Sequence, residues 1–419
     1  MSSASAFGRG DGWRYGLLGL PLAFVALPLY VIVPNHYARE FGVPLALLGA
    51  VLLGARLLDA FIDPLIGRWV DRLYARSTRA VLAFGAAAAV LLALGFALLF
   101  LPPVSEPLWA LAWAGATLAL TYTAYSAVSI AHQSWGAMLG GDETQRSRIV
   151  AWREGLGLVG VLLASVAPIA LGLPATAALF AGLLALGCWA WRDSRQPQAQ
   201  TGSRAEALWL PFTRAPFRRL LAVFLLNGTA SAVPATLVLF YAQDQLQAPR
   251  NIEPAFLGSY FLCAALSVPL WLMAVRRLGL ARTWLCGMVL AIVTFIWTLQ
   301  LGAGDIAAFL VVCALSGIAL GTDLALPGAL LAGVIADAGD RGRNEGAYFG
   351  WWNFATKLNL ALAAGLSLPL LGLAGYTPGT RAEDGLQALV LAYCLLPCLL
   401  KLAAAAALYF AVIRGEGAS

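Results

Sequence analysis

Residues 56–72, RLLDAFIDPLIGRWVDR, place three ionisable side chains in a segment that is otherwise suited to hydrocarbon. Arg56, Asp59 and Asp63 fall within eight residues, and long apolar runs precede and follow them. A charged group inside a bilayer is costly, so charges at such a position indicate a function or a specific pairing. Two questions follow: whether the surrounding chain spans a membrane, and what these charges do there.

Composition answers the first question. Of 419 residues, 61% are hydrophobic and 11% are charged, a balance that ordinary soluble domains do not have. Apolar segments long enough to cross ~30 Å of hydrocarbon recur along the chain. They must be helices, because backbone polar groups have to be satisfied internally in lipid and the alternation of a β-barrel is missing. The sequence therefore predicts an all-α integral membrane protein with twelve transmembrane helices. The predicted spans are 14–37, 44–67, 80–101, 107–135, 150–172, 175–192, 218–243, 254–274, 283–301, 306–334, 347–373 and 385–413.

The distribution of basic residues predicts the orientation. With both termini in the cytoplasm, 20 of the 27 Lys and Arg residues lie on the cytoplasmic side, and only Arg39, Arg250 and Arg381 lie opposite. Such a bias is typical of a multi-pass protein of the inner (plasma) membrane. The net charge of +6 follows from this topology and gives no reason to expect a nucleic-acid partner.

A polar connector divides the predicted helices six and six. We expect an N-terminal bundle at 1–191, a cytoplasmic connector at 192–217 and a C-terminal bundle at 218–419. The halves are weakly similar, since HYAREFGVP (36–44) resembles YAQDQLQAP (241–249). Two such bundles with a site between them near the bilayer midplane are typical of a secondary transporter.

The two acids of the opening stretch share one helix face. Asp59 and Asp63 are four residues apart, and Asp59 lies ~12 Å from Gly67 at the cytoplasmic end of the span. Paired carboxylates with nearby hydroxyls can hold a small cation or protons. The alternative is structural: Arg56 neutralises Asp59 one turn away, and Asp63 forms a pair or a cap.

Several motifs resemble one transporter family. The pattern Arg56-x-x-Asp59-Ala-x-x-Asp63-Pro64-x-x-Gly67-x-x-x-Asp71-Arg72 resembles helix two and the next loop of the glycoside–pentoside–hexuronide:cation symporters. This is the melibiose-permease-like branch of the major facilitator superfamily. The further matching motifs are Tyr122-Thr123, Asp142-x-x-x-Arg146, Arg153, and Arg343-Asn344-Glu345-Gly346 followed by Lys357. The resemblance implies a cation site at Asp59, Asp63 and Thr123. It also implies a gating loop, a tight turn in which Gly67, Asp71 and Arg72 take part.

Two further charges lie deep in predicted helices. Lys357 is ~15 Å and Asp323 ~16 Å from the ends of their spans. Lys357 is expected to act in coupling, the alternative being that it snorkels to the interface. Asp323 either pairs with Lys357 or orients the substrate. The candidate substrate-binding or coupling residues are Lys357, Asp323, Tyr122, Ser126, Arg153, Asn353 and Trp352. For Arg153 an ion pair with Glu154 is an equal alternative, and Trp352 also suits an interfacial aromatic belt.

Two departures from the family bear on the substrate and the ion. Helix one, GLLGLPLAFVALPLYVIVPNHY (16–37), carries no carboxylate, and Ser126 stands where sugar-recognising members have an acid. Ile62 stands where an asparagine is frequent, which removes an oxygen ligand and favours protons over sodium.

The sequence therefore predicts a secondary active transporter that works by alternating access. It would couple a proton or sodium ion to symport of a small polar solute, such as a glycoside or related sugar. An amphipathic solute such as a lysolipid is the alternative substrate, and a membrane sensor is the alternative class. Since no catalytic motif is found, we expect no enzymatic activity. We also expect a monomer without a cofactor, with no metal beyond sodium at Asp59 and Asp63.

Overall fold

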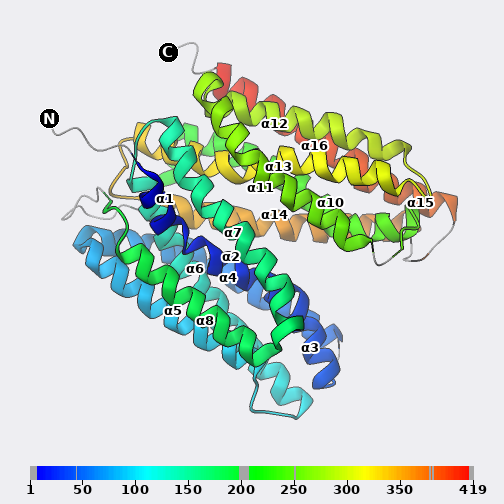
Figure 1. Ribbon diagram of the computed structural model, residues 1–419, viewed down its shortest axis with the longest axis horizontal. Coiled ribbons are helices and arrows are strands. Elements are labelled where there is room, and N and C mark those ends of the chain that lie inside the picture. The colour runs from blue at the N-terminus through cyan, green and yellow to red at the C-terminus, as the bar shows by residue number, and fades with distance from the viewer. Residues whose placement is uncertain are drawn as a thin grey trace. The chain divides into compact units, whose positions relative to one another are not determined.

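The computed structural model describes residues 7–43, 45–197, 207–249, 252–376, 379 and 382–414 (Figure 1). Every regular element in these ranges is helical, so the predicted all-α class is confirmed. Some predictions fall outside these ranges: the positions of Arg204, Arg250 and Arg381, and the 198–206 part of the connector.

Among its described residues, the first part of the chain contains eight α-helices. They are α1 (Arg9–Gly16), α2 (Gly19–Leu27), α3 (Val33–Glu40), α4 (Leu45–Arg76), α5 (Thr78–Phe100), α6 (Pro107–Met138), α7 (Glu143–Leu171) and α8 (Leu173–Arg192). A π-helical turn, η1 (Pro28–Ile32), joins α2 to α3. Because α4 continues to Arg76, the stretch Gly67–Arg72 lies within a helix, and the predicted tight turn there is wrong. The physical reason is that a helix can extend beyond the hydrocarbon, so the end of an apolar run need not end it.

The second part of the chain has the same character. Its α-helices are α9 (Leu210–Thr213), α10 (Ala215–Phe240), α11 (Glu253–Leu278), α12 (Leu280–Phe295), α13 (Ile306–Asp337), α14 (Glu345–Leu373), α15 (Glu383–Val390) and α16 (Leu396–Leu408). Shorter π- or 3₁₀-helical segments extend them: η2 (Tyr241–Gln245), η3 (Ile296–Gln300), η4 (Leu391–Leu395) and η5 (Tyr409–Ile413).

Length and hydropathy identify membrane spans directly among the described residues. Eight helical stretches are long and apolar enough to cross a bilayer. They are Thr78–Phe100, Glu143–Pro168, Leu173–Arg192, Ala215–Gln245, Glu253–Leu278, Leu280–Gln300, Ile306–Asp337 and Glu383–Ile413. The other predicted spans, at 14–37, 44–67, 107–135 and 347–373, fall on α1–α3, α4, α6 and α14. The total of twelve spans stays a prediction.

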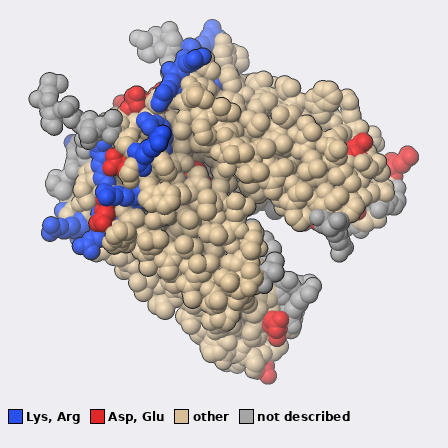
Figure 2. All heavy atoms as spheres, viewed as in Figure 1, with Lys and Arg blue, Asp and Glu red and all other residues tan. Residues whose placement is uncertain are grey.

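The helices form two compact units. Unit 1 comprises residues 1–213 and 332–354, and unit 2 comprises residues 214–331 and 355–419. The end of α13 and the beginning of α14 therefore belong with the N-terminal helices. On the visible face of each unit, Lys and Arg gather at one end of the helices and leave the long middle section free of charged residues (Figure 2). This is the surface expected of helices immersed in lipid.

Close helix contacts in unit 1 rely on glycine. Helices α2 and α7 pack closely against each other. A Cβ atom at Gly160 of α7 would overlap the carbonyl oxygen of Leu20 in α2. Small residues at such contacts let helix backbones approach closely, which is the main source of packing energy in lipid.

Gly160→Ala should therefore lower the melting temperature of the detergent-solubilised protein, with a loss of about 1–3 kcal/mol for overpacking. The matched control is Gly182→Ala in α8, where an added Cβ would meet no atom within 4 Å. Alanine normally favours a helix over glycine, so the control should melt at the same temperature or higher. Equal melting temperatures for the two variants would contradict the packing argument.

Candidate functional site

Two buried carboxylates lie on one face of α4. Asp59 is 5% exposed and Asp63 is fully buried. The hydroxyl of Ser126, on the neighbouring helix α6, donates a hydrogen bond to Oδ1 of Asp59 at 2.8 Å. The packing of α4 against α6 thus supplies a polar partner for Asp59 within unit 1.

The hydroxyl beside Asp59 is not the one that the sequence singled out. The resemblance implied Thr123 as the cation ligand and left Ser126 as a substrate-binding candidate. The structure places Ser126, which is 1% exposed, in contact with Asp59, while Thr123 is half-buried one turn earlier. Tyr122 is buried and, four residues before Ser126, shares its helix face. The roles of Thr123, Tyr122 and Ser126 stay predictions, with Ser126 now the hydroxyl adjoining the acid.

Glycines bring α4 and the beginning of α14 into backbone contact in unit 1. A Cβ at Gly67 would overlap the carbonyl oxygen of Gly346, and the converse holds as well. One turn further along α14, a Cβ at Gly350 would lie 2.7 Å from the carbonyl oxygen of Asp63. Gly67 is therefore needed for the approach of two backbones rather than for a turn.

Asp71 fixes the same contact. Its two carboxylate oxygens accept hydrogen bonds from the backbone N–H groups of Gly346 and Ala347, at 2.6 and 2.8 Å. These N–H groups belong to the first turn of α14, which has no intrahelical acceptors for them and carries partial positive charge. Asp71 is 2% exposed, whereas Arg72 is exposed.

A second acid is buried beside Asp71. Glu345, the first residue of α14, is fully buried and accepts a hydrogen bond from the N–H of Gly342 at 2.6 Å. Both acids lie outside the predicted spans. Burial raises the pKa of Glu345 to about 7. Burial, and then the nearby charge of Glu345, also raise the pKa of Asp71, and the two backbone N–H groups oppose this.

In unit 2, the largely buried Asp323 accepts hydrogen bonds from side chains of three helices. Oδ2 of Asp323, on α13, forms an ion pair with Nζ of Lys401 on α16 at 2.9 Å. Oδ1 accepts hydrogen bonds from Nδ2 of Asn227 at 3.0 Å and from the indole N–H of Trp284 at 2.8 Å. Lys401 also donates to the hydroxyl of Ser231 at 3.0 Å. The side chains of the ion pair are 13% and 11% exposed, so both charges are largely desolvated.

This geometry corrects the pairing suggested for Lys357. The sequence proposed Lys357 as the partner of Asp323 because their helices are consecutive, but the partner is Lys401 from a helix further along the chain. Lys357 lies half-buried in α14. One signal pointed to Lys401 all along, since it is one of two lysines in the chain and lies in an apolar segment.

Three candidates remain: Arg153, Asn353 and Trp352. Arg153 of α7 pairs with its neighbour Glu154, with Nε 3.0 Å from Oε1, as the ion-pair alternative expected. Asn353 is half-buried, and its Oδ1 accepts a long hydrogen bond from Gln133 at 3.4 Å. Trp352 is 5% exposed, which does not suit a side chain of the membrane interface.

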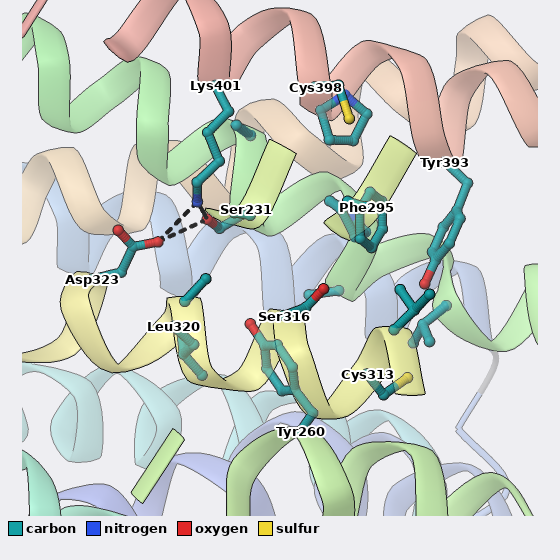
Figure 3. Close-up of a pocket in the computed structure, with 18 of the residues that line it drawn as sticks. Ser231, Tyr260, Phe295, Cys313, Ser316, Leu320, Asp323, Tyr393, Cys398 and Lys401 are labelled. Carbon is teal, nitrogen blue, oxygen red and sulfur yellow. Dashed lines mark hydrogen bonds and ion pairs between the residues drawn. The ribbon is translucent and has the colours of Figure 1, made fainter. Parts of the chain in front are cut away.

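A cavity of about 320 Å³ adjoins the ion pair of unit 2 (Figure 3). Asp323, Lys401 and Ser231 lie at one end, and Tyr260 and Ser316 point into its middle. Phe295, Tyr393 and further apolar residues of α10, α11 and α13 form the rest of the wall. The cavity thus joins a charged end to an aromatic and aliphatic body.

The part of the chain that the structure describes contains no group of three His, Cys, Asp or Glu side chains arranged to hold a metal ion. The expected sodium ligands at Asp59 and Asp63 therefore stay a prediction. They would need oxygen atoms of other groups, of which the Ser126 hydroxyl is the one already in contact.

Comparisons with known proteins agree on one family. A family model described as MFS/sugar transport protein matches residues 14–414. The "Uncharacterized symporter YjmB" of Bacillus subtilis (strain 168) is 24% identical, over 91% of this chain and 87% of that protein. The "Putative sulfoquinovose importer" of Salmonella typhimurium is 25% identical, over 97% of this chain and 88% of that one. A crystal structure of a bacterial homologue of iron transporter ferroportin in an outward-facing state matches with a TM-score of 0.72 at 16% identity, covering 96% of this chain and 100% of that chain. At that identity the structural match shows a shared fold alone.

We expect Lys401→Ala to destabilise the protein, because it leaves the Asp323 carboxylate buried without its cation. The loss should be on the order of 3 kcal/mol, and it should appear as a lower melting temperature in detergent. Adding Asp323→Ala should recover most of it. Combining Asp323→Ala with Lys357→Ala is the control, and it should show no such recovery. If the melting temperature recovers when Asp323→Ala is combined with Lys357→Ala but not when it is combined with Lys401→Ala, Asp323 pairs with Lys357 as first suggested.

The pKa of Glu345 predicts how stability depends on pH. A carboxyl group whose folded-state pKa lies above its ordinary value binds its proton more tightly in the folded protein, so stability falls as pH rises between about 4.5 and about 7. The contribution of Glu345 over this window is on the order of 3 kcal/mol. Glu345→Gln should flatten the fall in melting temperature from pH 5 to pH 8. Glu383 is exposed, so Glu383→Gln is the control, and its melting temperature should fall with pH as in the wild type. If the melting temperature of Glu345→Gln also falls as in the wild type, Glu345 is not the group responsible.

Proposed function

Because this chain belongs to the MFS/sugar transport protein family and is a secondary transporter, we propose that it is a cation-coupled symporter of a small polar solute. It is not an enzyme, as its family and its symporter relatives indicate. The substrate class that suits this family is a glycoside or a related sugar. The protein would take up this solute across the inner membrane by exposing one site to each side in turn.

The proposed architecture has twelve transmembrane helices in two bundles of six, at 1–191 and 218–419, joined by the connector 192–217. Support comes from the eight apolar spans and from the helical state of α1–α3, α4, α6 and α14 over the other predicted segments. The bias of arginine along the sequence supports cytoplasmic termini. We propose a monomer, since one chain of this length carries both bundles.

The proposed coupling site is the pair Asp59 and Asp63. The observation that carries the proposal is that both are buried, one turn apart on α4, with the Ser126 hydroxyl bonded to Asp59. Two carboxylates one turn apart, with a hydroxyl beside them, offer oxygen atoms that can hold a small cation or a proton. Ile62 offers no oxygen, which favours a proton over sodium.

The proposed route from ion to movement runs through α4. The backbone of Asp63 adjoins Gly350, and two turns further along α4 Asp71 bonds the first turn of α14. A change of charge at Asp59 and Asp63 would act on α4, and other residues of α4, Gly67 and Asp71, contact the beginning of α14. Lys357 lies on α14 beyond Gly350, so the same helix would carry the effect to a proposed coupling residue.

A second substrate class is favoured by one observation. The cavity of unit 2 has a charged end but mostly apolar walls, which suits an amphipathic solute such as a lysolipid better than a fully hydroxylated sugar. In either case, we propose that Asp323 and Lys401 contact the polar part of the solute.

The function is tested in proteoliposomes after a screen for ligands that raise the melting temperature, with sulfoquinovose, methyl glycosides and lysophosphatidylcholine as probes. In sodium-free vesicles, external addition of the active solute should alkalinise the medium in step with its uptake. Asp59→Asn should abolish uphill accumulation while sparing exchange. Undiminished uphill uptake by this variant would refute the coupling site. Uptake by the wild type that requires sodium and moves no protons would refute the proton as the coupling ion. Binding of the solute without flux would favour a sensor over a transporter.

A further inference from the structure

An open groove of about 560 Å³ runs along the outer surface of unit 1 between the beginning of α5 and the end of α8. These helices pack side by side (Figure 1). Arg79, Leu82 and Ala86 line it from α5, at spacings that put them on one face of that helix. Cys188, Trp189, Trp191 and Arg192 of α8, with Gln196 beyond it, complete the wall. None of these residues belongs to the proposed transport sites.

The groove is graded from basic to apolar. Arg79 and Arg192 are both exposed and lie at the end where α5 begins and α8 finishes. Leu82, Ala86 and Cys188 follow one to two turns further into the apolar section. Trp189 is 62% exposed, a position typical of an aromatic side chain at the level of lipid headgroups. An occupant that matches this gradient has an anionic head and an apolar chain.

A buried donor in the groove wall also lacks a partner. Trp191 is 1% exposed, and its indole N–H has no hydrogen-bond acceptor among the described residues. A buried indole N–H usually finds one. The neighbouring Trp135 does so, donating to the carbonyl of Arg195 at 3.0 Å. An acceptor oxygen supplied by a bound molecule would satisfy Trp191.

We propose that this groove binds one anionic phospholipid of the surrounding membrane. Its phosphate would pair with the guanidinium groups of Arg79 and Arg192, which suit the bidentate geometry of phosphate. An ester or phosphate oxygen would accept from Trp191, and the first methylene groups of an acyl chain would cover Leu82, Ala86 and Cys188. A free phosphate ion shares the head chemistry but leaves the apolar wall uncovered, so the gradient favours the lipid.

The test titrates the purified full-length protein, in an uncharged detergent, with dioleoyl phosphatidylglycerol and follows the melting temperature. Phosphatidylglycerol should raise it saturably, and dioleoyl phosphatidylcholine or inorganic phosphate at equal concentration should not. The double variant Arg79→Gln with Arg192→Gln should bind the lipid about 25-fold more weakly, since each basic residue at a membrane surface contributes about fivefold. Both arginines are exposed, so the variant should fold normally. Trp191→Phe should also weaken binding.

The matched control is Arg282→Gln, which removes an exposed arginine near the beginning of α12 and should leave the lipid titration unchanged. The proposal is overturned if the double variant titrates like the wild type, or if Arg282→Gln weakens binding equally, since the effect would then reflect general surface charge. It is also overturned if inorganic phosphate alone reproduces the shift.

Discussion

A charged or polar group buried away from water must find a partner, and the described sites of this transporter follow from that constraint. The constraint first sets the secondary structure, because helices satisfy their own backbone groups in lipid. It then determines where helices can meet, since each acid needs donors from another element. Asp59 takes the Ser126 hydroxyl, Asp71 takes the first N–H groups of α14, and Asp323 takes Lys401. Helix packing and site chemistry are thus two results of one requirement.

The acids differ in the kind of partner, and this difference suggests different roles. Asp323 is bonded by side chains from α10, α12 and α16, all within unit 2, so its cluster ties several helices of one unit together. Asp71 is bonded by backbone N–H groups of α14, which like α13 has residues in both units. A contact of the first kind stabilises a rigid body. A contact of the second kind lies where the chain passes from one unit to the other.

The sequence was sufficient for the class of fold and for the acids, but not for their partners. Apolar runs and the costs of burial predicted helices throughout and singled out Asp59, Asp63 and Asp323, and the family resemblance added Asp71. All four are buried or nearly so. The end of α4 was misjudged, because hydropathy marks the edge of hydrocarbon and not the end of a helix. The partner of Asp323 was also misjudged. Which face of α16 meets α13 depends on packing between distant segments, and no local pattern around Lys401 encodes it.

The strength of the Asp71 contact suits a transporter that must change its conformation. Leaving a buried N–H without an acceptor costs about 1–3 kcal/mol, so separating α4 from the two N–H groups of α14 would cost a few kcal/mol. Coupling energies between sites are typically about 1–3 kcal/mol, so the binding of an ion or a substrate can offset an interaction of this size. The same contact replaced by a buried ion pair would be harder to release, because each separated charge would stay in a low dielectric. We propose that Asp71, as a carboxylate that caps a helix, stabilises one conformation without making it permanent, and that the raised pKa values of Asp71 and Glu345 give protons a further means of altering that balance.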